Sequence, residues 1–261
     1  MKQIRNAVAA MIASWGLISD YQLPTSVIAP FRMKVPTTRV LFCLPLAGAF
    51  AALLVWIAAG CVSLLFNRVA GAIVFTVAGG ALLFFKDSGS GFSLLLSYAG
   101  SRLKGEEPVV ALGRSDSSLG DVLRTPVMML AAVICMIFIL GMLFLLFFRG
   151  AGFWFVAVAA ADAFVQGRLC LENDRNTHLP FIRAPRNGIN YLAASGIILA
   201  LVMLMVFPAI ASLGAIVVLW VWFWRELPGA GEFEEGLTSE WITMYGFFAS
   251  VLTLLCGMGL L

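Results

Sequence analysis

Short polar segments interrupt an otherwise apolar chain, and they hold the residues that could carry chemistry. In Lys86–Gly91, Asp87 stands beside two glycines, an arrangement that could hold Mg²⁺ while backbone amides approach a phosphate. A plain helix stop is the alternative, because Ser and Gly end helices and a terminal lysine can reach toward water. In Arg114–Asp121, Asp116 is either a metal ligand or a capping residue for the next apolar run.

Arginines and one isolated acid form the next candidate group. Asp162 lies inside an apolar stretch, where an acid is costly and is therefore a functional candidate. A structural pair with Arg168 would explain it equally well. Arg183 and Arg186 either set the topology or contact phosphate, since planar guanidinium groups suit phosphate recognition.

An acidic segment precedes the last apolar run. A solvated loop explains Glu232–Glu235, whereas Glu240 at the helix entry is either a Mg²⁺ ligand or a favourable partner of the helix dipole. The five cysteines show no paired metal spacing, and the single histidine, His178, excludes a multi-histidine metal site. The chain has no Walker sequence, GxSxG elbow or Rossmann fingerprint.

The composition indicates that membrane helices position these segments. Hydrophobic residues make up 61% of the chain and charged residues 12%, against about 25% charged in soluble domains. We therefore expect one all-α membrane domain over residues 1–261, a polytopic integral membrane helical bundle of about 6–7 transmembrane helices. The expected spans are 40–67, 69–85, 125–148, 150–165, two short helices within 187–224 that break near Pro208, and 241–261. The segment 150–165 is either a full span or only partly inserted.

The distribution of basic residues predicts the orientation. Fifteen of the 17 lysine and arginine residues fall in alternate segments, and only Arg68 and Arg149 fall in the others. Basic residues stay on the cytoplasmic side, so the N-terminus and the polar segments should face the cytoplasm from the plasma (cell inner) membrane. Residues 1–39 should form an interfacial helix and a loop, and 86–124 and 166–188 cytoplasmic loops. The net charge of +3 gives no reason to expect nucleic acid as a partner.

Several short motifs also follow one another in a fixed order. They are Leu23-Pro24, Leu44-Pro45-Leu46-Ala47-Gly48, Gly79-Gly80, the stretch from Leu83 to Gly91, Asp116-Ser117-Ser118-Leu119-Gly120, Pro180 with Arg183 and Gly188, and Gly236-Leu237-Thr238-Ser239-Glu240. In this order the chain resembles the cobalamin synthase family, the adenosylcobinamide-GDP ribazoletransferases. The acidic motif of that family has three aspartates, at the positions where this chain has Leu83, Asp87 and Ser90.

The resemblance implies a Mg²⁺-dependent membrane transferase. It would join adenosylcobinamide-GDP to α-ribazole or its 5′-phosphate, making adenosylcobalamin or its phosphate and releasing GMP. Its implied residues are Asp87 and Asp116 for catalysis, the same two with Glu240 for the metal, and Arg183, Gly91 and Thr238 for the substrate phosphates. Asp87, Asp116, Glu240 and Arg183 should then converge on one cytoplasmic pocket. Its partners would be these substrates and the lipid bilayer, with a homo-oligomer left open.

Two other functions stay open. A catalytically impaired homologue could keep the fold as a membrane scaffold or binding subunit, because two aspartates of the acidic motif are replaced. A small-solute transporter would share the polytopic character and the helix broken near Pro208, but the chain lacks the two related halves common in transporters.

Overall fold

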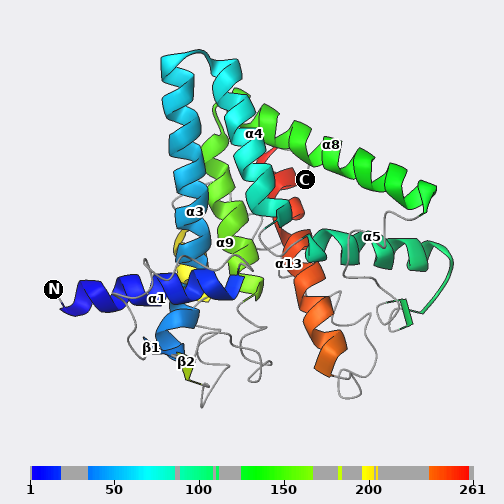
Figure 1. Ribbon diagram of the computed structural model, residues 1–261, viewed down its shortest axis with the longest axis horizontal. Helices are drawn as coiled ribbons and strands as arrows, with labels where there is room; N and C mark the ends of the chain where they lie inside the picture. The colour runs from blue at the N-terminus through cyan, green and yellow to red at the C-terminus, as the bar shows by residue number, and fades with distance from the viewer. Residues whose placement is uncertain are drawn as a thin grey trace.

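The computed structural model describes residues 2–18, 35–85, 89–107, 110–111, 125–166, 182–183, 196–202, 204 and 235–258. These residues are helical apart from turns and one pair of two-residue strands, so the all-α class is confirmed for this part of the chain. Three helices, α3 (Thr37–Leu65), α4 (Arg68–Phe85) and α9 (Phe155–Gln166), run side by side (Figure 1). Helix α1 (Lys2–Ile18) lies across α3, and α5 (Ser90–Leu103) extends away from the bundle beside α13 (Glu235–Gly257).

A tight hairpin joins the first two long helices. α3 spans Thr37–Leu65 and α4 spans Arg68–Phe85, close to the expected runs 40–67 and 69–85. Asn67 lies in the turn, where its side-chain Oδ1 accepts a hydrogen bond of 2.7 Å from the backbone N–H of Ala70 and so caps α4. α3 continues through Pro45 without a break in its helical assignment.

Helix α8, Pro126–Phe148, opens on a proline in its first turn as the sequence predicts. α8 and the Cys43–Leu65 part of α3 are, within the described residues, the two helices long and apolar enough to cross a membrane. The apolar parts of α4 and of the helices near 152–165 and 243–257 are shorter. The number of about 6–7 spans therefore stays a prediction. The break near Pro208 lies outside the described residues.

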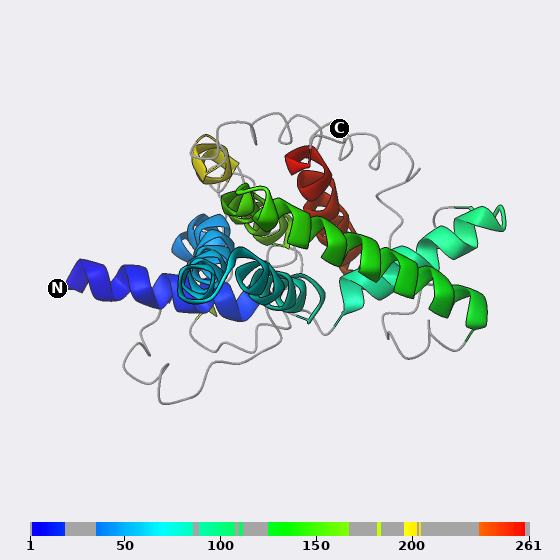
Figure 2. The same cartoon turned by 90° about the horizontal axis from the view of Figure 1, so that it is seen from above.

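The expected segment 150–165 forms a 3₁₀ turn, η2 (Gly152–Trp154), followed by α9 (Phe155–Gln166). With 12 residues, α9 is about 18 Å long, shorter than the hydrocarbon core of a bilayer. It nevertheless lies at the centre of the bundle, between α3 and α13 (Glu235–Gly257) (Figure 2). Nearly all its side chains are buried.

Small residues allow this central position. A Cβ atom on Gly48 of α3 would lie 2.3 Å from the backbone oxygen of Ala159 and 2.8 Å from the Cβ of Ala163. At its other end, α9 is linked to α13, because the indole N–H of Trp154 donates a hydrogen bond of 2.8 Å to the carbonyl of Thr253. The aromatic ring of Phe155 also packs edge-on against Phe75 of α4, with centroids 5.4 Å apart.

Two helices, α1 and α5, run roughly at right angles to α3 in Figure 1. α1, Lys2–Ile18, crosses the first turns of α3 in both views and includes the stretch 7–18 where the sequence predicts a helix (Figures 1 and 2). α5, Ser90–Leu103, was not expected, because the sequence predicts a loop over 86–124. It follows Gly89, whose φ of 81° favours glycine, and packs against α13.

The strands form a parallel pair far apart in sequence. β1, Val35–Pro36, pairs with β2, Ile182–Arg183, with Pro36 opposite Arg183. β1 also contacts α1 and α3, so the backbone of Arg183 is held beside the start of α3.

Candidate functional site

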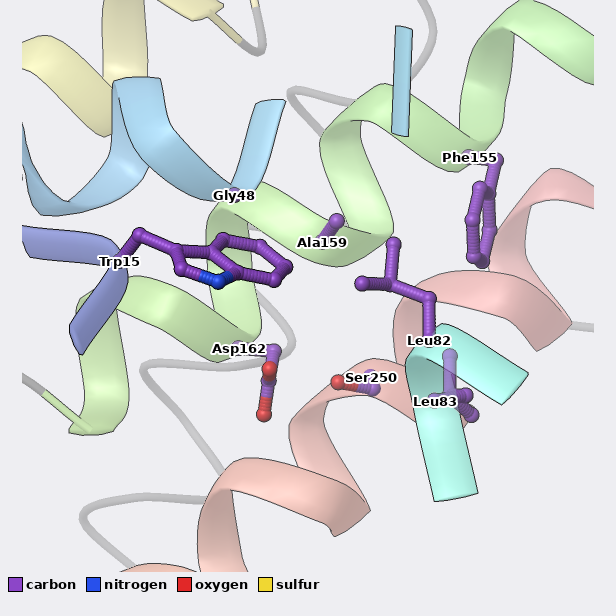
Figure 3. A pocket seen from close by; sticks show the side chains of 8 residues that line it. All are labelled: Trp15, Gly48, Leu82, Leu83, Phe155, Ala159, Asp162 and Ser250. Carbon is purple, nitrogen blue, oxygen red and sulfur yellow. The ribbon is translucent and has the colours of Figure 1, made fainter. Parts of the chain in front are cut away.

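A small cavity lies where α1, α3, α4, α9 and α13 meet (Figure 3). Its volume is about 20 Å³, enough for about one water molecule. Most of its wall is apolar, and two polar side chains face it. The lining residues are Trp15, Gly48, Leu82, Leu83, Phe155, Ala159, Asp162 and Ser250.

Asp162 is the acid of this cavity. It belongs to the central helix α9 and is 6% exposed, deeper than any other charged side chain among the described residues. The residue takes part in a further hydrogen-bonding or electrostatic contact within the protein. A buried charge is costly unless polar contacts compensate it, so a carboxylate at this depth is a candidate functional group. The predicted pairing with Arg168 lies outside the described residues.

Ser250 supplies the second polar group. Its hydroxyl donates a hydrogen bond of 3.0 Å to the carbonyl of Gly246 one turn earlier in α13, which leaves oxygen lone pairs as acceptors. Figure 3 shows its oxygen on the side that faces Asp162, with the Trp15 indole forming another wall of the cavity. The arrangement suits one buried water or proton between a carboxylate and a hydroxyl. In its present volume it does not admit a nucleotide-sized substrate.

The residues predicted from the sequence lie elsewhere. Asp87 and Asp116 are outside the described residues, as are the side chains of Arg183, Thr238 and Glu240. The backbone of Arg183 stands in β2 beside α1 and α3, and positions 238 and 240 lie in the first turns of α13. Gly91 is buried in the first turn of α5. Their convergence on one pocket therefore stays a prediction.

An aromatic cluster does bring two of the motif-bearing segments together, through three helices. Phe84 near the end of α4, Phe92 in α5 and Phe247 in α13 pack with ring centroids 5.2 to 5.7 Å apart. Phe84 and Phe92 bracket the segment that contains Asp87. Position 240 precedes Phe247 by two helical turns and shares its face of α13. The cluster thus anchors both flanks of the acidic motif to the helix that carries Glu240.

Metal binding has no support among the described side chains. No three His, Cys, Asp or Glu residues in this part of the chain form a group that could hold an ion. The described cysteines are free thiols at Cys43, Cys61, Cys135 and Cys256. A Mg²⁺ site on Asp87, Asp116 and Glu240 stays a prediction; carboxylate oxygens are the ligands that Mg²⁺ prefers, so the donor types fit.

Sequence reasoning identified Asp162 but missed Trp15 and Ser250. The run of small residues in α1 could have indicated that the helix of Trp15 packs closely on the bundle, because Ala9, Ala10 and Ala13 are buried there. For Ser250 no local signal existed, because serine inside an apolar helix commonly bonds to its own backbone.

Compared with protein-family models, with curated proteins and with solved structures, this chain matches none of them.

Proposed function

We propose that the protein is integral to a membrane, and one observation carries this proposal. The most apolar helix, α8, is peripheral and exposes large side chains, whereas the central helix α9 buries an acid. Ile137 is 65% exposed and Leu130 62%, but Asp162 is 6% exposed. A water-soluble protein normally buries its most apolar helix, so this distribution suits lipid around the bundle.

The proposed location is the plasma (cell inner) membrane, with the N-terminus and the predicted site toward the cytoplasm. The concentration of fifteen basic residues in alternate segments supports this orientation. A contact between two turns supports the orientation too. The guanidinium of Arg68, at the turn between α3 and α4, lies 5.5 Å from the ring centroid of Phe148 at the end of α8. The two segments assigned to the non-cytoplasmic side therefore share one end of the bundle.

A charge substitution on α8 tests the membrane. Ile137→Lys should reduce stable insertion, since a lysine near the middle of a membrane helix costs about 2.5–3.5 kcal/mol. Leu103→Lys, at the exposed end of α5, is the matched control and should insert normally. Resistance to alkaline carbonate extraction measures insertion. Equal extraction resistance of the two variants would contradict the proposal.

For the activity, we propose a divergent transferase similar to cobalamin synthase. It would join adenosylcobinamide-GDP and α-ribazole with release of GMP. Two features support it beyond the order of the motifs. Gly48 and Leu83 belong to different motifs of the resemblance and line the same cavity. The Phe84, Phe92 and Phe247 cluster links the Leu83–Gly91 motif to the helix that carries the 236–240 motif.

The proposed roles follow from the chemistry of a pyrophosphate substrate. Asp87, Asp116 and Glu240 would hold Mg²⁺, which supplies positive charge against the pyrophosphate. The guanidinium of Arg183 and the hydroxyl of Thr238 would donate hydrogen bonds to phosphate oxygens. Gly91 would allow a close approach of substrate to the backbone.

One specific observation favours the second candidate, a non-catalytic homologue that acts as a membrane scaffold or binding subunit. Leu83 stands where the family has an aspartate, and its side chain is 6% exposed in the apolar wall of the cavity. A leucine packed in this way serves the structure of the protein, as expected of a homologue that keeps the fold without the activity.

GMP release in liposomes separates the two candidates, and complementation of a strain lacking its cobalamin synthase provides a cellular readout. A transferase should release GMP in a Mg²⁺-dependent manner and lose this activity in Asp87→Ala. Leu83→Asp with Ser90→Asp should raise the activity, and Leu83→Asn with Ser90→Asn is the uncharged control. Absence of turnover in every folded variant would contradict the transferase and favour the non-catalytic homologue.

A further inference from the structure

Two arginines belong to neighbouring segments at the end of the bundle opposite α1: Arg68 contacts Phe148 and lies near Gly150, the two residues that flank Arg149. Arg68 opens α4, and Arg149 directly follows α8 as its C-cap residue. The Arg68 guanidinium packs over the Phe148 ring, and its Nη2 would lie 3.2 Å from a Cβ atom on Gly150. Gly150 has a φ of 87°, which favours glycine, and this turn keeps its backbone open to Arg68. Both arginines are exposed.

Among the described residues, the segments that meet at this end bring no acid to the two arginines. The first turn of α4 has no acid, and its amino terminus adds about +0.5 charge beside Arg68. The carboxyl terminus of α8 contributes about −0.5 beside Arg149, so the two dipoles cancel and the charge of both arginines remains. The sequence has no acid between Asp20 and Asp87 or between Asp121 and Asp162, so neither connection supplies a counter-charge.

Exposed apolar side chains precede Arg68 in the chain. Leu64 is 89% exposed, Leu65 77% and Phe66 76%, all at the end of α3 next to Arg68. A free anion would use the guanidinium groups alone, whereas a phospholipid would also cover these apolar side chains.

We propose that Arg68 and Arg149 bind the phosphate of an anionic phospholipid, whose acyl chains pack along Leu64, Leu65 and Phe66. The inference rests on the proposed placement of the bundle in a membrane. Guanidinium groups bind phosphate oxygens through paired N–H donors. A zwitterionic lipid carries its own cation beside the phosphate, so it gains less from two arginines than an anionic lipid does.

Native mass spectrometry of the full chain in detergent tests the proposal, with phosphatidylglycerol and phosphatidylcholine as probes. Each arginine should contribute about fivefold to phosphatidylglycerol affinity, since a basic residue near anionic lipid is worth about 1 kcal/mol. Arg68→Gln with Arg149→Gln should therefore weaken binding by about 25-fold and leave phosphatidylcholine unchanged. Lys104→Gln, another exposed basic residue, is the matched control and should change binding by less than about twofold.

Further variants and outcomes keep the test decisive. Arg68→Lys with Arg149→Lys retains both charges and should keep most of the preference even if the glutamine variants fold poorly. Unchanged phosphatidylglycerol binding in the double glutamine variant, an equal loss in Lys104→Gln, or displacement of the lipid by inorganic phosphate would overturn the proposal. Carbonate extraction of the wild-type chain would instead count against the membrane placement itself.

Discussion

Helices α8 and α9 follow one another in sequence, yet their compositions and their places in the fold are opposite. α8 is long, rich in Leu, Met and Phe, and exposes Val127, Leu130 and Ile137. α9 is short, rich in alanine, carries Asp162 and is buried on nearly every side. In a lipid environment bulky apolar side chains gain nothing from protein burial, whereas small residues allow close helix packing. Hydropathy is therefore a better guide to the helices that can face lipid than to the helices at the centre of the bundle.

Deleting one aromatic ring from each helix should give the largest contrast. Phe155 of α9 is fully buried against Phe75, so Phe155→Ala should lower the free energy of unfolding by about 3–5 kcal/mol. Phe138 of α8 is 54% exposed, and Phe138→Ala should cost less than about 1 kcal/mol. Unfolding in mixed micelles measures both. Similar losses would mean that α8 is packed against protein as extensively as α9.

Adding a methyl group sharpens the same comparison. Gly48→Ala should destabilise the protein by about 1–3 kcal/mol, because the new Cβ would overlap the α9 backbone at Ala159. Gly141→Ala in α8 meets no atom within 4 Å, and it should be neutral or slightly stabilising because alanine favours helix. Equal stability of the two variants, measured in the same micelle titration, would disprove the close approach of α3 and α9.

A smaller effect is expected from the hydrogen bond that ties α9 to α13. Trp154→Phe keeps an aromatic ring but removes the N–H donor to the Thr253 carbonyl, at a cost of about 1 kcal/mol. Trp56→Phe on α3 is the control for the loss of an indole ring, since Trp56 is partly buried against the core. The comparison between α9 and α8 would need revision if Trp154→Phe proved no more destabilising than its control.

Buried hydroxyls should matter least. Ser250 donates to Gly246 within its own helix, so Ser250→Ala leaves no unpaired backbone group and should change the free energy of unfolding by less than about 0.5 kcal/mol. A loss above about 2 kcal/mol would show that the hydroxyl also stabilises a buried partner such as the Asp162 carboxylate. Thermal unfolding in detergent with and without the substitution provides the measurement.

Part of this fold was readable from the sequence, for identifiable reasons. α3, α4 and α8 each contain a long uncharged run bounded by basic residues, and Pro126 marks a helix start. α5 escaped prediction because its 14 residues are rich in Ser and Gly, and its apolar face has meaning only against α13. The burial of α9 was also unpredictable, since a short alanine-rich segment does not reveal its neighbours.

The residues of the candidate site, too, were only partly predictable from the sequence. Asp162 was identifiable from the cost of an acid in an apolar stretch. Trp15, Gly48 and Ser250 reach it from three other helices, and only tertiary packing brings them together. The neighbourhood of Asp87 and Glu240 was inferred from the order of motifs, and the described aromatic cluster supports the proximity of their segments without testing the carboxylates.

The contact between Trp154 and α13 also bears on how the chain is made. α9 leaves the ribosome well before α13, its second flanking helix, because about 70 residues separate them; at about 5–20 residues per second this is a delay of about 4–14 s. During that interval a short helix containing an acid has α3 on one side but lacks the partner for its indole N–H. Completion of the bundle therefore depends on a helix that is synthesised later, and a ribosome stalled before residue 235 would expose an unfinished centre to chaperones and proteases.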